Sequence, residues 1–276
     1  MVGSLTIVTV CVTLCISLLL PVAALIVYGV KNKGKGVWTA WLLGAAGFVV
    51  MQLVIRMPIL SILSLMPAFV EFSTSHYVLY CFILALTAGL FEVAGRYVVA
   101  KLMSKRLTFT RGIAAGMGHG GIEAIMIVGM TYVNNILYIV MINSGQLDTI
   151  VEQTAAMGVD TASLLAIKEV LIGTSPVIFL LAGYERILTM IFHVALSLLV
   201  CYFVSRKKDI SGIVICLVCH CAVDFVAPFV NGLATPYMGN RISTTTAYVI
   251  VYIFLTVVAV PAILAVRRIS VKWKNE

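Results

Sequence analysis

The sequence predicts an all-α protein: a polytopic membrane helix bundle of about seven transmembrane helices, with the N-terminus outside and the C-terminus in the cytosol. Three observations favour this fold class. Hydrophobic residues make up 62% of the 276 residues and charged residues only 11%, and the mean hydropathy is +1.10. The apolar residues form runs long enough to cross a bilayer, for which a helix needs about 20 residues. Basic residues fill alternate gaps between these runs.

The apolar runs divide the chain into seven predicted spans and one long connection. The first run is not preceded by basic residues and is too long for the apolar part of a signal peptide, so we expect it to be retained. The sequence shows no linker, low-complexity tract or repeat, so we expect residues 1–276 to form a single membrane domain. The predicted spans are residues 4–29, 37–64, 77–100, 112–141, 183–204, 210–230 and 243–266.

The distribution of charge predicts the orientation of these spans. Lys and Arg collect in cytoplasmic connections, and here they follow the first, third, fifth and seventh spans, whereas acidic residues lie in the other connections. The net charge of +8 therefore reports topology and does not indicate nucleic-acid binding. We expect a multi-pass protein of the plasma membrane. The basic residues concerned are Lys31, Lys33, Lys35, Lys101, Lys105, Arg106, Arg111, Arg206, Lys207, Lys208, Arg267, Arg268, Lys272 and Lys274.

Residues 142–182 form the one long external connection. Residues 160–163 offer helix-capping side chains, and Leu164, Ile167 and Leu171 recur at helical spacing before Gly173. We expect a helix that lies at the outer membrane surface, either as a plain amphipathic connector or as a lid.

The seven cysteines all lie within apolar stretches. They are typical of small buried hydrophobic residues, and no disulfide framework is indicated. Cys216, Cys219 and His220 match the spacing of a c-type haem attachment site, but a helix in mid-membrane leaves no room for the haem, so we set this match aside.

Ionisable residues inside the apolar spans are the main indication of function. A charged or titratable side chain costs several kcal/mol in a bilayer unless it faces protein or water. At about 1.5 Å per residue from the basic gaps, these residues fall in one layer of the cytosolic half, with one aspartate nearer the midplane. We therefore expect one shared site on four helices. Its residues are Glu92 and Arg96, His119 and Glu123, His193, and His220 and Asp224.

These residues allow more than one chemistry. Glu92 and Arg96 are spaced for a helical ion pair, which either is structural or holds Glu92 ionised as a base. The His119/Glu123 pair lacks the His-Glu-x-x-His pattern of common zinc proteases. A zinc site built from one glutamate and three imidazoles remains possible: Glu123 with His119, His193 and His220. Alternatively, a glutamate deprotonates water, an imidazole relays the proton, and His or Asp donors stabilise the oxyanion.

Other polar positions have simpler interpretations. Gly112, Gly116 and Gly120 recur at every fourth position of the fourth span, a spacing that lets helices approach closely in lipid. Gln52 and Arg56 in the second span are interpreted as structural polar contacts, and so is Arg186, which we place at an external helix start.

At these residues the sequence resembles the YhfC family of intramembrane proteases. More distantly it is similar to the CPBP group, which includes the type II CAAX-prenyl proteases, to PrsW, and to the multipass scaffold subunit of gamma-secretase. The wider group has Glu-Glu-x-x-x-Arg, then Phe-x-x-x-His, then His-x-x-x-Asn or Asp. Here Phe91 occupies the place of the first Glu. The matching segments are residues 91–97, 118–124, 185–193 and 220–224.

The resemblance implies an intramembrane endopeptidase of the glutamic type, with Glu92 or Glu123 as the base. It implies no cofactor; zinc is possible but not favoured. The expected substrate is a membrane protein or a lipidated or hydrophobic peptide. Two alternatives from other classes remain open: a non-catalytic scaffold or binding protein, and a proton-coupled transporter. The substrate and the oligomeric state are not predicted.

Overall fold

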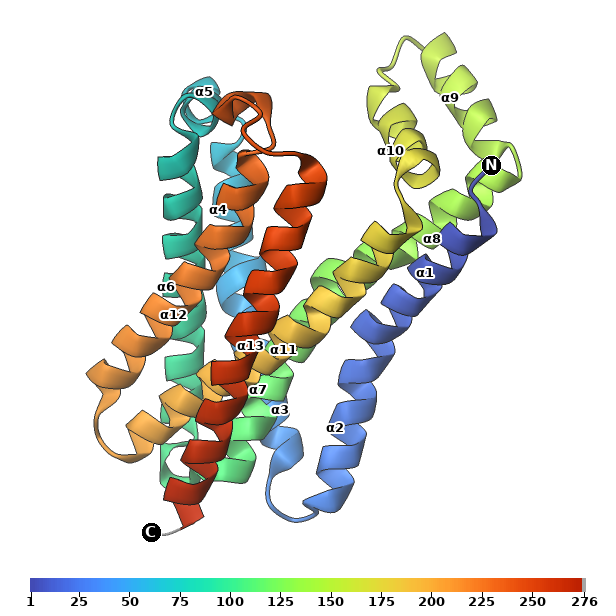
Figure 1. The fold of residues 1–276 in the computed structure, drawn as a ribbon. Helices are drawn as coiled ribbons and strands as arrows, with labels where there is room; N and C mark the ends of the chain where they lie inside the picture. Colours follow the sequence, from blue (N-terminus) through green and yellow to red (C-terminus); the bar gives the residue numbers. More distant parts are fainter. Residues whose placement is uncertain (275–276) are drawn as a thin grey trace. The chain divides into compact units, whose positions relative to one another are not determined.

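The computed structural model describes residues 1–274, and these residues form helices joined by turns, without a β-strand (Figure 1). The prediction of an all-α fold is confirmed. Within the described residues, seven helices are long and apolar enough to cross a membrane, as predicted. They are Ser4–Lys31, Val37–Leu63, Tyr77–Leu102, Phe109–Asn143, Pro176–Ser205, Asp209–Gly232 and Thr244–Trp273.

Several of these spans are composed of more than one helical element. Three short π-helical segments (η1, η2 and η4) interrupt the α-helices, and two others (η3 and η5) are 3₁₀ turns. In chain order the elements are α1 (Ser4–Leu14), η1 (Cys15–Leu19), α2 (Leu20–Lys31), α3 (Val37–Phe48), η2 (Val49–Arg56), α4 (Met57–Leu63), α5 (Pro67–Ser75), α6 (Tyr77–Leu102), η3 (Ser104–Arg106), α7 (Phe109–Glu123), η4 (Ala124–Gly129), α8 (Met130–Asn143), α9 (Gln146–Ala156), α10 (Ala162–Gly173), α11 (Pro176–Ser205), α12 (Asp209–Gly232), η5 (Pro236–Met238) and α13 (Thr244–Lys274).

The long connection contains the predicted helix, which is α10, and a second helix that was not predicted. The second helix is α9, and the backbone N–H of Ala162 donates to the Asp160 carboxylate just before α10. Helix α11 begins at Pro176 and not at 183, because the apolar residues 176–182 continue the helical pattern and proline is well tolerated in a first turn. Arg186 therefore lies in the interior of α11 and not at its start. There it pairs with Glu185.

The chain forms two compact units. Unit 1 comprises Met1–Ala23 and Ala124–Ile187, and unit 2 comprises Ala24–Glu123 and Leu188–Glu276. The single membrane domain expected from the sequence stays a prediction.

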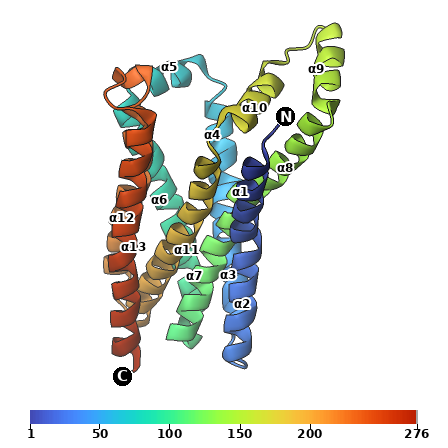
Figure 2. The ribbon, with the colours of Figure 1, turned by 45° about the vertical axis from the view of Figure 1, so that its right-hand side comes forward.

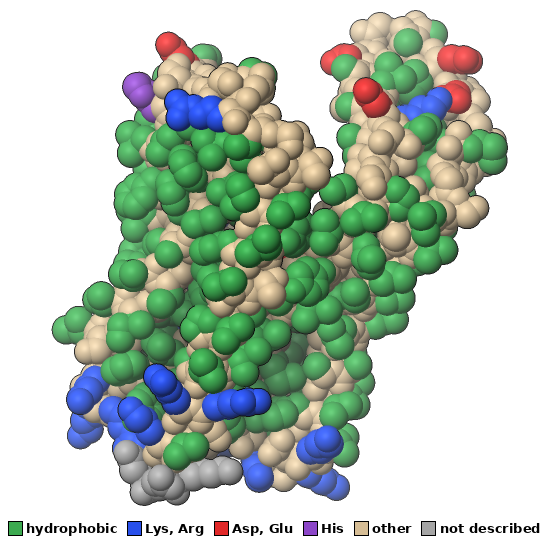
Figure 3. Space-filling view, viewed as in Figure 1, with side chains coloured by type: hydrophobic (Ala, Val, Ile, Leu, Met, Phe, Trp, Pro, Cys, Tyr) green, Lys and Arg blue, Asp and Glu red, His purple; other side chains and the backbone are tan. Residues whose placement is uncertain are grey.

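In unit 1, α1 packs along α8. Its core contains Val10, Tyr132, Leu171 and Phe179. Two buried hydroxyl groups bind the same backbone oxygen: Oγ1 of Thr13 and the phenol of Tyr132 both donate to the carbonyl oxygen of Phe179, over 2.7 and 3.0 Å. Acidic side chains lie on the α9–α10 segment of this unit (Figure 3).

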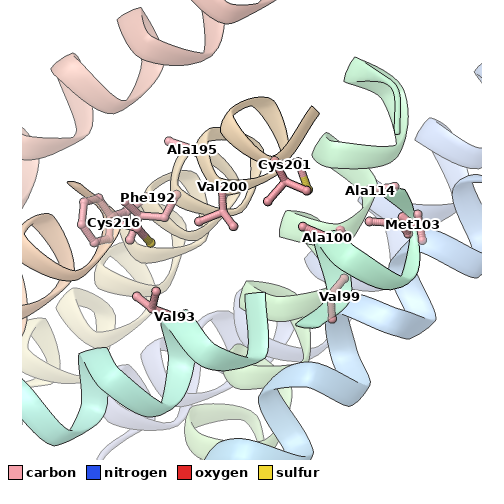
Figure 4. Packing of buried hydrophobic residues seen from close by; sticks show 14 of the residues in the cluster. Val93, Val99, Ala100, Met103, Ala114, Phe192, Ala195, Val200, Cys201 and Cys216 are labelled. Carbon is pink, nitrogen blue, oxygen red and sulfur yellow. The ribbon is translucent and has the colours of Figure 1, made fainter. Parts of the chain in front are cut away.

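In unit 2, the most extensive packing joins α3 to α7 and α6 to α12, and Figures 1 and 2 show both pairs side by side. The hydrophobic core lies among α6, α7, α11 and α12. Figure 4 shows Phe192 and Cys216 close together, with Val93 of α6 nearby. This core surrounds the ionisable residues described below, since each of the four helices contributes to both.

Glycine permits the closest helix contacts of unit 2. A Cβ on Gly118 of α7 would lie 2.0 Å from the carbonyl oxygen of Trp41 in α3, and a Cβ on Gly120 would lie 2.8 Å from Cβ of His193 in α11. No larger residue fits at such distances without moving a helix. The predicted close approach along the fourth span is therefore present, and it fixes α7 against two neighbours.

Lys and Arg side chains gather at one end of unit 2, where the connections α2–α3, α6–α7 and α11–α12 and the end of α13 lie (Figure 3). Above this end the surface is mostly apolar. The segregation is what a membrane-crossing bundle requires. The assignment of the basic end to the cytosol stays a prediction.

Candidate active site

The carboxylate of Glu92 is the centre of a buried cluster in unit 2. Glu92 lies in α6 and is 5% exposed. Its Oε2 atom lies 2.9 Å from Nη2 of Arg96, 3.0 Å from Nε2 of His119 and 2.6 Å from Nε2 of His220. Groups from α6, α7 and α12 therefore meet at one oxygen atom. Without such partners a buried carboxylate would be strongly unfavourable.

His193 connects this centre to the second glutamate. Its Nδ1 lies 2.6 Å from Nη2 of Arg96 and its Nε2 lies 2.7 Å from Oε2 of Glu123. Because the guanidinium nitrogens carry only donors, Nδ1 accepts from Arg96. Nε2 and the Glu123 carboxylate form an ion-pair contact, so His193 lies between Arg96 and Glu123.

His220 connects the centre to a more accessible carboxylate. Its Nδ1 lies 3.1 Å from Oδ2 of Asp224, and its Nε2 faces Glu92. The Asp224 side chain is 31% exposed, against 6% for Glu92. Because carboxylates only accept, His220 makes both bonds only when both of its nitrogens carry a proton. Asp224 is therefore the outer end of a short chain of hydrogen bonds that leads to the centre.

A small cavity adjoins the cluster. It has a volume of about 10 Å³ and is lined by Arg96, His119 and Ser197 among others. Nε and Nη1 of Arg96 and Oγ of Ser197 are buried and, within residues 1–274, have no hydrogen-bond partner. A cavity of this size with polar lining can hold one water molecule. The site therefore offers room and donors for a small polar species beside His119.

Local helix geometry helps to position these side chains. Two π-helical segments border the site: η2 contains Gln52, and η4 begins directly after Glu123. Such segments have a wider turn and occur often at functional sites because they redirect side chains. The face of α7 near His119 and Glu123 carries glycines, so α11 comes close enough for His193 to reach Glu123.

The structure brings all seven predicted residues into this one cluster. It pairs them differently from the sequence prediction in one respect. We expected His119 and Glu123 to form a pair within their helix, whereas the bonds run between helices, from His119 to Glu92 and from His193 to Glu123. Spacing along a helix cannot reveal these partners, since they belong to other spans. The functional roles of the seven residues stay predictions.

Sequence analysis missed the part that Gln52 plays here. Its side chain is 4% exposed, and its Nε2 donates to Oε1 of Glu92 over 2.7 Å. Arg56 in turn donates from Nη1 to Oε1 of Gln52. The interpretation of this pair as structural polar contacts did not foresee that the contacts reach Glu92. The signal was present, since Gln52 and Arg56 have the same four-residue spacing within an apolar span as the other polar pairs.

The cluster also fits a metal ion. Glu92, His119 and His193 each offer a ligand atom, and these atoms lie within 4.8 Å of one another. In a tetrahedral zinc site with bonds of about 2.0–2.1 Å, ligand atoms lie roughly 3.3 Å apart. The separations of Oε2 of Glu92 from His119 and His193, 3.0 and 3.7 Å, lie near that value. A carboxylate with two imidazoles is also a normal donor set for zinc. An ion held by these atoms would replace the hydrogen bond that Arg96 donates to Nδ1 of His193 and the one between His119 and Glu92.

An apolar pocket of about 390 Å³ lies close to the site in unit 2, between α11, α12 and α13. Phe192 lines it and also contacts the rings of His193 and His220, with centroid distances of 6.3 Å in both cases. One phenylalanine therefore separates the apolar pocket from the ionisable cluster.

Fold and site together define a class: a multispan helical membrane protein with a buried carboxylate–histidine centre that can bind a metal. The comparison with protein families is more specific. Residues 16–238 match the YhfC intramembrane metalloprotease family, so the chain belongs to this family, as its resemblance predicted. The chain is also 40% identical over 126 residues to the "Uncharacterized membrane protein YhfC" of Bacillus subtilis (strain 168). That match covers 45% of this chain and 47% of the relative, about half of each. No solved structure matches the chain.

These findings correct one prediction. We expected no cofactor and did not favour zinc. The family is described as one of metalloproteases, and Glu92, His119 and His193 could hold a metal ion. Zinc was not favoured because the resemblance implied a glutamic mechanism and because spacing along the chain does not show whether ligands from separate helices meet. These donors come from α6, α7 and α11 and meet only through helix packing.

Proposed function

We propose that the protein is a metal-dependent intramembrane endopeptidase that hydrolyses a peptide bond in a membrane-associated protein or hydrophobic peptide. The observation that carries the proposal is the convergence of three imidazoles on one buried carboxylate oxygen, with the distances given above. Membership of an intramembrane metalloprotease family supports the same reaction class. The proposed location is the plasma membrane, with the site in its cytosolic half.

Glu92, His119 and His193 are the proposed ligands of a divalent metal ion, with Zn²⁺ as the first candidate. When bound, such an ion makes water more acidic and polarises a carbonyl oxygen, which are the two activations that peptide hydrolysis needs. The charges are compatible with a divalent ion. With His220 protonated and the other two imidazoles neutral, the carboxylates of Glu92, Glu123 and Asp224 still outweigh the two cations, Arg96 and His220, and leave a net negative charge.

Glu123 is the proposed general base. Its side chain is 12% exposed, more than that of Glu92, and Oε2 lies 2.7 Å from Nε2 of His193. In the proposed reaction Oε2 takes a proton from the attacking water, whose oxygen bonds to the carbonyl carbon. As the carbon–nitrogen bond breaks, the departing nitrogen receives that proton. A carboxylate beside the proposed metal ligands is placed both to take the proton from water and to pass it to the departing nitrogen.

Arg96 and the His220–Asp224 pair are the proposed electrostatic partners. Arg96 presents buried N–H donors toward the cavity beside His119, where they can stabilise negative charge that develops on a substrate oxygen. Asp224 orients His220, and His220 holds Oε2 of Glu92 in place. Outer partners of this kind fix the direction of a ligand and its basicity.

Two measurements test the proposal. Purified protein in detergent is analysed for bound metal, and cleavage of a panel of single-span model substrates is followed in proteoliposomes with and without a chelator. We expect about one metal ion per chain and cleavage that stops with the chelator and returns with Zn²⁺. The variants His119→Ala and His193→Ala should lose the metal, whereas His76→Ala, at the exposed end of α6, should retain it. Metal-free wild-type protein, or cleavage by both His variants, would contradict the proposal.

A further inference from the structure

The buried amide of Gln52 donates a hydrogen bond to the Glu92 oxygen that does not face the histidines. Oε2 of Glu92 faces Arg96, His119 and His220, whereas Oε1 accepts from Nε2 of Gln52 over 2.7 Å. The two oxygens of the carboxylate therefore have different hydrogen-bond partners. Rotation of the carboxylate about its last bond would break the contact on Oε1, so Gln52 fixes the plane of the carboxylate and thereby directs its other oxygen at the histidines.

Arg56 fixes the orientation of that amide. Its Nη1 lies 3.2 Å from Oε1 of Gln52, and a guanidinium can only donate. The Gln52 atom that faces Arg56 must therefore be oxygen, and the amide nitrogen must face Glu92. Arg56 itself is tied to α6, through Nη2 to the carbonyl oxygen of Leu84 at 2.9 Å and through Nε to Oγ1 of Thr87 at 3.3 Å.

We propose that Gln52 is a positioning residue for the ligand Glu92, and that Arg56 acts through Gln52. This inference rests on the proposed function, because it assigns Gln52 a task in forming the metal site. Loss of a partner that orients a ligand typically weakens metal binding about 10- to 100-fold. A residue that serves only in packing would leave the metal affinity unchanged.

The test is metal affinity, measured in detergent without substrate by competition with a chelator, together with the visible spectrum of the Co²⁺-loaded protein. We expect Gln52→Leu to bind Zn²⁺ about 10- to 100-fold more weakly, with an altered Co²⁺ spectrum. Arg56→Lys should lower the metal affinity less, because an ammonium group can still donate to Oε1 of Gln52 but cannot also make the guanidinium contacts to Leu84 and Thr87. Gln153→Leu on the exposed surface of α9 is the matched control.

The outcomes separate the two proposals. If wild-type protein binds no metal, the proposed function fails and takes this inference with it. If wild-type protein binds metal and Gln52→Leu binds it equally well, only the role of Gln52 is overturned. If Gln52→Leu does not fold, Arg56→Lys and Thr87→Val provide the test. Unchanged metal affinity and an unchanged Co²⁺ spectrum in both variants would overturn the proposed positioning role of Gln52.

A second observation, independent of the first, concerns the basic end of unit 2. A pocket of about 510 Å³ is lined by three cationic side chains and two threonines, and none of its lining residues is acidic: Lys35, Arg106, Thr108, Thr110 and Arg111. They come from the α2–α3 connection, η3 and the start of α7. In the part of the chain that the structure describes, no carboxylate pairs with these three cations.

Arg111 is held in place at this pocket. Its Nε donates to the carbonyl oxygen of Lys35 over 3.0 Å. The guanidinium lies across Gly36, whose φ is +75° and where a Cβ would come within 2.4 Å of Nη2. At the start of α7, Thr108 accepts from the backbone N–H groups of Arg111 and Gly112, through Oγ1 and the carbonyl oxygen, which fixes this end of the helix beside the pocket. A fixed cation beside a helix start and two further cations is suited to a phosphate group.

We infer that this basic pocket binds the phosphate of an anionic lipid headgroup. Basic pockets at the ends of membrane helices bind such headgroups, and each basic residue near an anionic surface contributes enough that removal of two predicts roughly 30-fold weaker binding. The competing explanation is that these residues serve only the general charge asymmetry of the bundle.

Binding is measured for phosphatidylglycerol, phosphatidylcholine and inorganic phosphate by native mass spectrometry of the detergent-solubilised chain. We expect selective retention of phosphatidylglycerol and its loss in the double variant Arg106→Gln/Arg111→Gln. The double variant Lys207→Gln/Lys208→Gln, with the same charge change at the same end, should retain the lipid. Equal loss in both variants overturns the inference. If the protein retains inorganic phosphate and does not prefer phosphatidylglycerol to phosphatidylcholine, the proposal of a lipid ligand is overturned and the pocket is a site for free phosphate.

Discussion

The two units bury polar groups in different ways. In unit 1 most of these contacts are neutral and reach backbone: Thr13 and Tyr132 donate to the carbonyl oxygen of Phe179, and the Asn143 amide oxygen accepts from the N–H of Val2. The buried Arg186 of this unit pairs with its chain neighbour Glu185. In unit 2 the buried groups are ionisable and bind one another, with Glu92 held by Arg96 and by imidazoles from other helices.

The difference teaches how to separate a structural polar contact from a site. A neutral donor on a backbone carbonyl satisfies one hydrogen bond and needs no further group. Buried charge is much more costly and persists only within a network whose members all need one another. A protein that needed only stability could fill the centre of unit 2 with apolar residues, so the retained charge indicates chemistry.

The largest expected effect follows from Glu92→Gln. The change removes the carboxylate that three imidazoles face, so metal affinity should fall by more than about 100-fold, beyond the range for outer partners. Arg96 loses its buried ion-pair partner, which costs about 3–5 kcal/mol. Metal titration of the monodisperse fraction measures the first effect and thermal unfolding the second. Unchanged metal affinity would place the metal, if any, elsewhere.

Glu123→Gln should affect the reaction without removing the metal. A glutamine can still accept from Nε2 of His193, but it cannot take a proton from water. We expect the cleavage rate to fall about 10²- to 10⁴-fold, the range for general base catalysis, with metal stoichiometry intact. Single-turnover cleavage and metal analysis of the same sample provide the check. Full activity in this variant excludes Glu123 as the base.

Asp224→Asn should have an intermediate effect. The amide is neutral and orients His220 less strongly, so we expect metal affinity or cleavage rate to fall about 10- to 100-fold. The same assays measure it. An effect as large as that of Glu92→Gln would show that Asp224 contacts the metal or the substrate directly.

The smallest effects are expected in unit 1. Thr13→Val removes one donor from the carbonyl oxygen of Phe179, which keeps Tyr132 as its partner. A loss of about 1 kcal/mol in the free energy of unfolding is expected, with metal affinity unchanged. Chemical or thermal unfolding in detergent measures the first quantity. A change in metal binding would erase the contrast between the two units.

Much of the fold was predictable because membrane spans depend on local properties. Length and apolarity define a span wherever the sequence supplies them, so seven spans were predicted and seven were found. The start of α11 was misplaced, since residues 176–182 are apolar enough to extend either a loop helix or the span itself. The ends of helices depend on neighbours as much as on their own residues.

The candidate site was predictable in membership but not in connections. Charge inside an apolar span singles out a residue by itself, and so Glu92, His119 and His193 could be chosen from the sequence. Gln52 was not included in the predicted site because a neutral amide costs less to bury than a charged group and so indicates a site less strongly. The metal was not favoured because spacing along the chain does not show whether ligands from separate helices meet.

By itself, the sequence determined that this protein is a helical membrane protein and which of its side chains are too costly to be buried without partners. Only the tertiary structure decided the partners: Glu123 contacts His193 of α11, and Glu92 contacts groups from four other helical elements, η2 included. The physical reason is range. Transfer of a segment into lipid depends on its own atoms, whereas a hydrogen bond or a metal ligand set depends on how helices distant in sequence pack together.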